Sequence, residues 1–72
     1  MTLAQVPVGQ TVKIRSLHFD DVLGKRCLAL GLRQGVSVTV IRRAPLNGPI
    51  HIQIGATELA IRRTQAELIK VL

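Results

Sequence analysis

Imidazole, thiol and carboxylate side chains bind transition metals, and the candidate ligands of this 72-residue chain are His18, Cys27, His51 and Glu58. Imidazole, thiolate and carboxylate groups hold a metal ion when short spacings such as CxxC or HxxxH bring two of them to one face. No such spacing occurs here, since even His51 and Glu58 lie seven positions apart. We therefore expect no metal site and no cofactor. If a metal ion were bound, His18, Cys27 and His51 would be the candidate ligands.

The acidic residues do not form a catalytic set. Asp20 and Asp21 are adjacent, so they cannot flank a substrate, and they are better placed to cap a helix and interact with its dipole. The chain contains no GxxxxGK[ST] loop for nucleotide phosphates and no arrangement typical of a Ser-His-Asp triad. The sequence therefore predicts a protein that is not an enzyme.

Two arginine pairs, Arg42-Arg43 and Arg62-Arg63, are the strongest candidates for binding. The chain has 10 Lys and Arg against 4 acidic residues and a formal charge of +6, which favours nucleic acid, an acidic protein face or an anionic membrane surface. Both pairs are expected at the ends of neighbouring strands, where they either form one patch or only keep the protein soluble. The absence of Trp and Tyr disfavours single-stranded nucleic acid, which usually stacks on aromatic side chains.

Leu32 and Leu46 are apolar residues in expected loops. Apolar side chains in loops either dock on a partner or plug the ends of a barrel, and both alternatives stay open. The loop 45–49 is equally well explained as a rigid hairpin connection with Asn47-Gly48 as its corner. The predicted partner-binding set is Leu32, Arg33, Leu46, Arg42, Arg43, Arg62 and Arg63.

Alternating apolar and polar residues predict a mostly β protein. This period-2 pattern is typical of strands with one buried face. Strands are expected at 11–15, 36–43, 50–54, 58–62 and 68–72. The buried faces carry Val, Ile and Leu, because Phe19 is the only aromatic residue.

The stretch Leu30 to Gly35 predicts the end of a helix, two glycine corners and the start of the second strand. A Gly after the last helical turn adopts the left-handed conformation that Cβ disfavours, which suits Gly31. This short helix would begin at Asp20 or Asp21, and Thr64 would cap a helical turn over 64–67. The expected fold is a small SH3-like five-stranded barrel, closed on itself, in one domain over 1–72.

Several of these motifs, taken together, resemble the FeoA family of ferrous iron transport proteins. They are the sequence LALGLxxG at 28–35, VxVIR at 38–42, APLNGPIHI at 44–52 and LAIRR at 59–63. The resemblance covers about 8–71. It implies an SH3-like barrel in the bacterial cytoplasm that supports FeoB, the membrane GTPase permease for Fe(II).

The expected function is thus that of an accessory protein that docks on FeoB and touches the membrane only through it. Two alternatives are a basic module that binds nucleic acid and a protein that binds Fe(II) directly, and a weak homo-oligomer is also compatible. The single Cys27 allows no internal disulfide, and the N-terminal residues do not resemble a signal peptide, so we expect a cytoplasmic protein.

Overall fold

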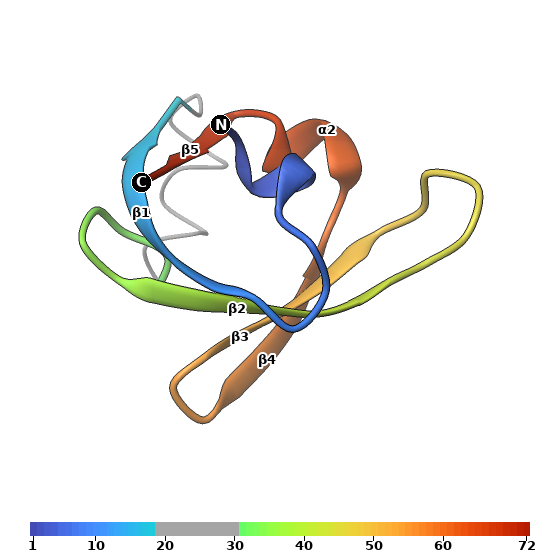
Figure 1. Cartoon of the computed structure of the whole chain (residues 1–72), viewed down its shortest axis with the longest axis horizontal. Coiled ribbons are helices and arrows are strands. Elements are labelled where there is room, and N and C mark those ends of the chain that lie inside the picture. The colour runs from blue at the N-terminus through green and yellow to red at the C-terminus, as the bar shows by residue number, and fades with distance from the viewer. Residues whose placement is uncertain (19–30) are drawn as a thin grey trace.

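The computed structural model describes residues 1–18 and 31–72, so the helix expected between the first two strands lies outside the described residues. Figure 1 shows the described part as a strongly curled sheet with two short helical segments on its concave side. The strands are β1 (Thr11–Leu17), β2 (Ser37–Arg43), β3 (Ile50–Ile54), β4 (Thr57–Ile61) and β5 (Ile69–Val71). The helical segments are the 3-10 turn η1 (Leu3–Gln5) and α2 (Arg63–Ala66).

The sheet is antiparallel throughout and has the strand order β4-β3-β2-β1-β5. This confirms the predicted mostly β class, but the predicted closure is wrong. In the described part of the chain β4 and β5 form the two edges and do not pair with each other. The chain passes from one edge to the other, from β4 to β5, through α2 (Figure 1).

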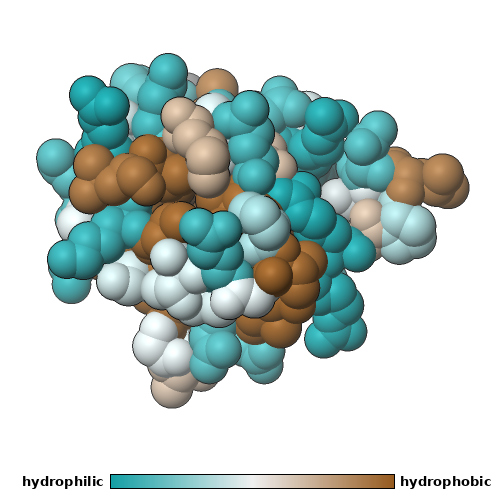
Figure 2. Space-filling model, in the orientation of Figure 1, coloured by the Kyte–Doolittle hydropathy of each residue, from teal (hydrophilic) through white to brown (hydrophobic). Residues whose placement is uncertain are grey.

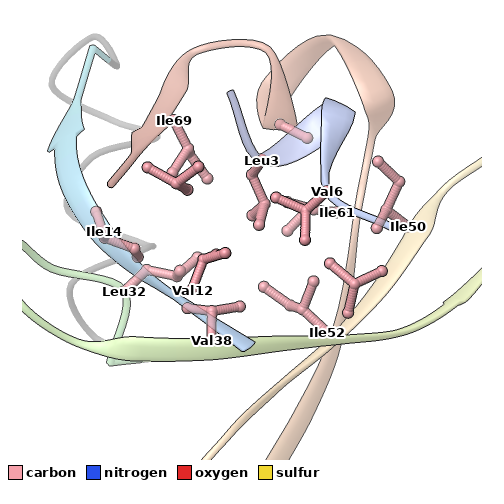
Figure 3. Close-up of a cluster of buried hydrophobic side chains, with 13 residues drawn as sticks. Leu3, Val6, Val12, Ile14, Leu32, Val38, Ile50, Ile52, Ile61 and Ile69 are labelled. Atoms are coloured by element: carbon pink, nitrogen blue, oxygen red, sulfur yellow. The ribbon is translucent and has the colours of Figure 1, made fainter. Parts of the chain in front are cut away.

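Aliphatic side chains from all five strands and both helical segments fill the concave side of the sheet (Figure 3). The predicted alternation holds: Ile50 and Ile52 are buried, whereas Gln53 between Ile52 and Ile54 is exposed. Burial of such a side chain contributes about 1.5–3 kcal/mol, so this cluster supplies most of the stabilisation of a chain this short. Leu3 and Val6 complete the core from η1 and the residue after it, a part that the sequence pattern did not indicate.

Gly31 has the positive φ that the sequence predicted, +94°, and Gly35, predicted as the second glycine corner, has φ +86°. In the turn from Arg33 to Val36 the Val36 amide donates to the Arg33 carbonyl at 3.2 Å, with Gly35 in the third position, where a type II turn requires positive φ. The Gly35 amide also donates to the Ile14 carbonyl at 2.8 Å. These corners place Leu32 over the core and start β2 beside β1.

The β2–β3 hairpin turns one residue earlier than predicted. The Gly48 amide donates to the Pro45 carbonyl at 3.1 Å, and the central residues Leu46 and Asn47 have φ of 57° and 58°, as in a type I′ turn. A corner centred on Asn47-Gly48 would need an N–H from Pro49 to close it, and proline has none. The prediction failed because it weighed the Asn-Gly pair and overlooked the proline that follows.

Gly48 is required for space and not for a left-handed backbone. A Cβ at this position would lie 2.8 Å from Ala44 Cβ and 3.1 Å from the Pro45 carbonyl oxygen. Gly48→Ala is therefore expected to lower the free energy of unfolding by about 1–2 kcal/mol, as overpacking does, in a thermal or urea melt. Gly55→Asn is the control, because Gly55 has φ +58° with open space around it and Asn tolerates that conformation. An equal loss from both substitutions would contradict the steric argument.

The helical turn α2 begins one residue earlier than predicted, and its cap is not Thr64. The N-cap position is Arg62, whose backbone amide donates to Gln65 Oε1 at 3.1 Å. The 3-10 turn η1 uses the same device, since the Thr2 amide donates to Gln5 Oε1 at 2.9 Å. A glutamine three residues after the cap thus satisfies a free N–H at both segments.

Candidate partner-binding surface

The two histidines that were candidate metal ligands lie at opposite ends of the sheet. His18 follows the end of β1, where its Nε2 lies 3.1 Å from Ser16 Oγ. His51 lies in β3 opposite Arg42, at the far end of the sheet from His18. Within 1–18 and 31–72, no group of three or more His, Cys, Asp or Glu side chains could hold a metal ion. Cys27 lies outside the described residues, as do Asp20 and Asp21.

The described core contains no polar or charged side chain. Catalytic groups normally lie in a cleft where burial and neighbouring charges tune them. In the described ranges the chemically active side chains therefore belong to the exterior.

A bulge in β2 decides which side of the sheet each arginine of the first pair faces. The register with β3 shifts between Val40 and Arg42, so that Arg42 lies opposite His51 and Arg43 lies opposite Ile50. Ile50 points into the core, and strict alternation from Val40 would have placed Arg42 on that inner side instead. Arg42 and Arg43 thus face opposite sides of the sheet, and the bulge exchanges the sides that strict alternation from Val40 would give them.

Arg43 is already engaged within the protein. Its Nη2 donates to the Ala4 carbonyl at 2.6 Å and also to the Val6 carbonyl. These bonds hold the segment around η1 against the end of β2. Arg43, predicted as a partner contact, therefore has a structural role in this conformation.

The second arginine pair follows β4, which is not a neighbour of β2, because β3 lies between them. Both pairs still lie at the same end of the sheet, since the register joins Arg43 to Ile50 and Ile50 to Ile61. Two strand spacings separate them by about 10 Å. Arg63 forms an ion pair with Glu67, with Nε and Oε1 3.7 Å apart and both side chains about half exposed.

Arg33 does not belong to this cluster. It is exposed in the turn before β2, whereas Arg42 lies near the other end of that seven-residue strand. A strand of that length spans about 20 Å, so the predicted binding set divides between two ends of the sheet.

The two loop leucines have opposite environments. Leu32 has no exposed surface and contacts the core cluster, so the plug alternative holds for it and it offers nothing to a partner in this conformation. Leu46 is 98% exposed at the tip of the β2–β3 hairpin. Figure 2 shows an apolar group projecting at the right of the molecule, where the hairpin lies in Figure 1, with hydrophilic residues around it.

The structure therefore brings Leu46 and Arg42 to one end of the sheet and places Arg62 two strands away at the same end. Of the other residues predicted to bind a partner, Leu32 is buried and Arg43 is hydrogen-bonded to backbone carbonyls. Residues 1–18 and 31–72 contain no helix long and apolar enough to cross a membrane.

A curled five-stranded sheet with an aliphatic core and a cationic exterior defines a small, mostly β module of SH3-like type. The chain belongs to the FeoA family, because the model of the FeoA domain matches residues 1–72. A Porphyromonas gingivalis protein described as a Fe(2+) transport protein A/Fe(2+) transporter FeoB fusion is 31% identical over 71 residues. That match covers 99% of this chain but only 8% of the fusion protein.

Solved structures of FeoA proteins share the fold. The FeoA protein of Chlorobium tepidum has a TM-score of 0.93 and 32% identity, covering 99% of this chain and 68% of that one. The Stenotrophomonas maltophilia FeoA, solved with zinc and described as a procaryotic SH3 domain protein, has a TM-score of 0.83 and 28% identity, covering 99% and 88%. A manganese-dependent transcriptional repressor matches at a TM-score of 0.89 with 18% identity, covering 100% and 40%, which shows a shared fold alone.

Proposed function

We propose that this chain is a cytoplasmic accessory module for ferrous iron uptake that docks on a FeoB membrane permease. The FeoA–FeoB fusion of Porphyromonas gingivalis is the observation that carries the proposal. Joining two modules in one chain raises the effective concentration of each at the other, which is useful when they work in contact. A separate FeoA chain must obtain the same proximity from the affinity of its surface.

The end of the sheet that carries Leu46, Arg42 and Arg62 suits such docking. Its exposed cations favour an acidic partner face and accelerate encounter at low salt. A module that docks in this way regulates a GTPase permease only if it contacts two states of the permease differently. We propose that residues 1–72 act as a single domain in this role and reach the membrane only through the permease.

The test is a binding measurement between the purified chain and full-length FeoB from the same organism in nanodiscs. We expect saturable binding that weakens as salt rises from 50 to 500 mM, because screening acts on exposed charges. Empty nanodiscs and a labelled DNA duplex are the controls. Absence of binding to FeoB at the lowest salt would overturn the proposal, and tighter binding to the duplex than to FeoB would favour a nucleic-acid module.

A further inference from the structure

Leu46 combines two properties that rarely occur together. It is 98% exposed, and its φ is 57°, in the left-handed region that L-residues with a Cβ avoid. Type I′ turns favour Asn, Asp or Gly at this position, so the leucine is unfavourable for hydration and for backbone conformation alike. Strained positions of this kind persist where the surrounding structure imposes them, and they concentrate at functional sites.

The hairpin holds this conformation firmly. The Gly48 amide closes the turn on the Pro45 carbonyl, and the Ala44 amide donates to the Pro49 carbonyl, each at 3.1 Å. Gly48 also allows the two arms to approach closely, as its position beside Ala44 shows. Two prolines further restrict the arms, since their φ is fixed. The leucine is therefore presented on a rigid support instead of a flexible loop.

The hairpin carries only positive charge. Positions 41–57 include Arg42 and Arg43 but no Asp or Glu. Arg43 is bound to the carbonyls of Ala4 and Val6, so Arg42 is the arginine of this pair that is free to meet a partner. In the described part of the chain the structure shows no ion pair for Arg42. The chemistry that complements this tip is an apolar pocket with carboxylates at its rim.

The rigidity of the hairpin indicates whether Leu46 binds a protein pocket or a lipid surface. A bilayer accepts an apolar side chain in any backbone conformation, so it gives no advantage to a strained and fixed turn. A shaped pocket rewards a preorganised side chain, because less freedom is lost on binding. The geometry therefore favours a protein partner.

We propose that the hairpin tip, residues 44–49, is the docking element of this module, with Leu46 seated in an apolar pocket of FeoB and Arg42 against carboxylates on the pocket rim. The inference rests on the proposed function, since it names the surface through which that docking occurs. It also explains why a leucine occupies a position where asparagine would be more stable.

The test compares Leu46→Asn with the wild type by affinity for FeoB in nanodiscs and by thermal melting. Asparagine keeps the left-handed turn and removes the apolar side chain. We expect the dissociation constant to rise at least tenfold, the change that burying one leucine supplies, while Tm rises by about 4 °C. A variant that is more stable yet binds more weakly cannot be explained by loss of folding. Leu68→Asn, at a leucine that is 41% exposed beyond α2, is the matched control and should leave the affinity unchanged.

Each other outcome overturns a defined part of the proposal. Wild-type affinity in Leu46→Asn would overturn the docking tip and leave the proposed function standing. Absence of binding to FeoB by the wild type would overturn both. Binding to anionic vesicles of phosphatidylglycerol that is lost in Leu46→Asn, with no binding to FeoB, would identify a lipid surface instead. Arg42→Glu should weaken binding and flatten its salt dependence, and an unchanged salt dependence would exclude Arg42 from the interface.

Discussion

Leu32→Ala is expected to lower the free energy of unfolding by about 3 kcal/mol, within the range found for leucine truncation in a packed core. Leu32 has no exposed surface, and Figure 3 shows it among the core side chains beside Ile14. A domain of this size has a total stability of roughly 4–11 kcal/mol, so the variant would lose about a quarter or more of it. A urea melt monitored by circular dichroism measures the loss, which corresponds to a fall in Tm of about 12–24 °C.

The matched control is Leu46→Ala, which removes the same atoms from a side chain that is 98% exposed. Both leucine and alanine carry a Cβ, so the strain of the left-handed turn is unchanged and the stability should shift by less than about 0.5 kcal/mol. Equal losses in the two variants would show that Leu32 is not part of the core. The two variants also help to interpret binding experiments. Loss of FeoB binding in a Leu32 variant would indicate unfolding and not a missing contact with FeoB.

The strands of this protein were predictable because a buried face imposes a period of two. Ile50, Ile52 and Ile54 alternate with polar residues, and the structure confirms the strand with the predicted bounds. Gly31 and Gly35 were predictable for a related reason, since positive φ is the conformation that glycine tolerates best. Both signals are local in the sequence.

The features that failed depend on distant parts of the chain. Nothing beside Leu32 indicates whether a leucine between two glycines folds inward, because residues distant in the sequence supply the core that receives it. The bulge after Val40 exchanged the sides of Arg42 and Arg43, and no residue near it is a glycine or proline that would have indicated it. In the described part of the chain β4 and β5 are unpaired edges of the sheet, and the spacing of residues does not indicate whether two edge strands pair. The sequence therefore proposed candidate residues for the surface but not how they are arranged in space.

Arg43→Gln is expected to lower the free energy of unfolding by about 2 kcal/mol. Its guanidinium donates to the carbonyls of Ala4 and Val6, and Val6 has no exposed surface while Arg43 is in place, so the substitution removes the donor from a part-buried carbonyl. A buried acceptor left without a partner costs about 1–3 kcal/mol, which is more than the net value of an ordinary hydrogen bond. Urea unfolding measures the effect, and the amides of residues 2–6 should exchange with solvent faster than in the wild type.

Arg42→Gln provides the control, because it makes the same substitution one position earlier and removes the same charge. Arg42 is exposed on the opposite side of the sheet, so its loss should change stability by less than about 0.5 kcal/mol. Affinity for FeoB should respond in the reverse order, falling in Arg42→Gln and holding in Arg43→Gln at temperatures where both variants are folded. A larger stability loss at Arg42 than at Arg43 would contradict the bulge, since strict alternation along β2 predicts that order. The two substitutions thus distinguish two roles of adjacent arginines: Arg43 holds the N-terminal segment, and Arg42 is the proposed contact with a partner.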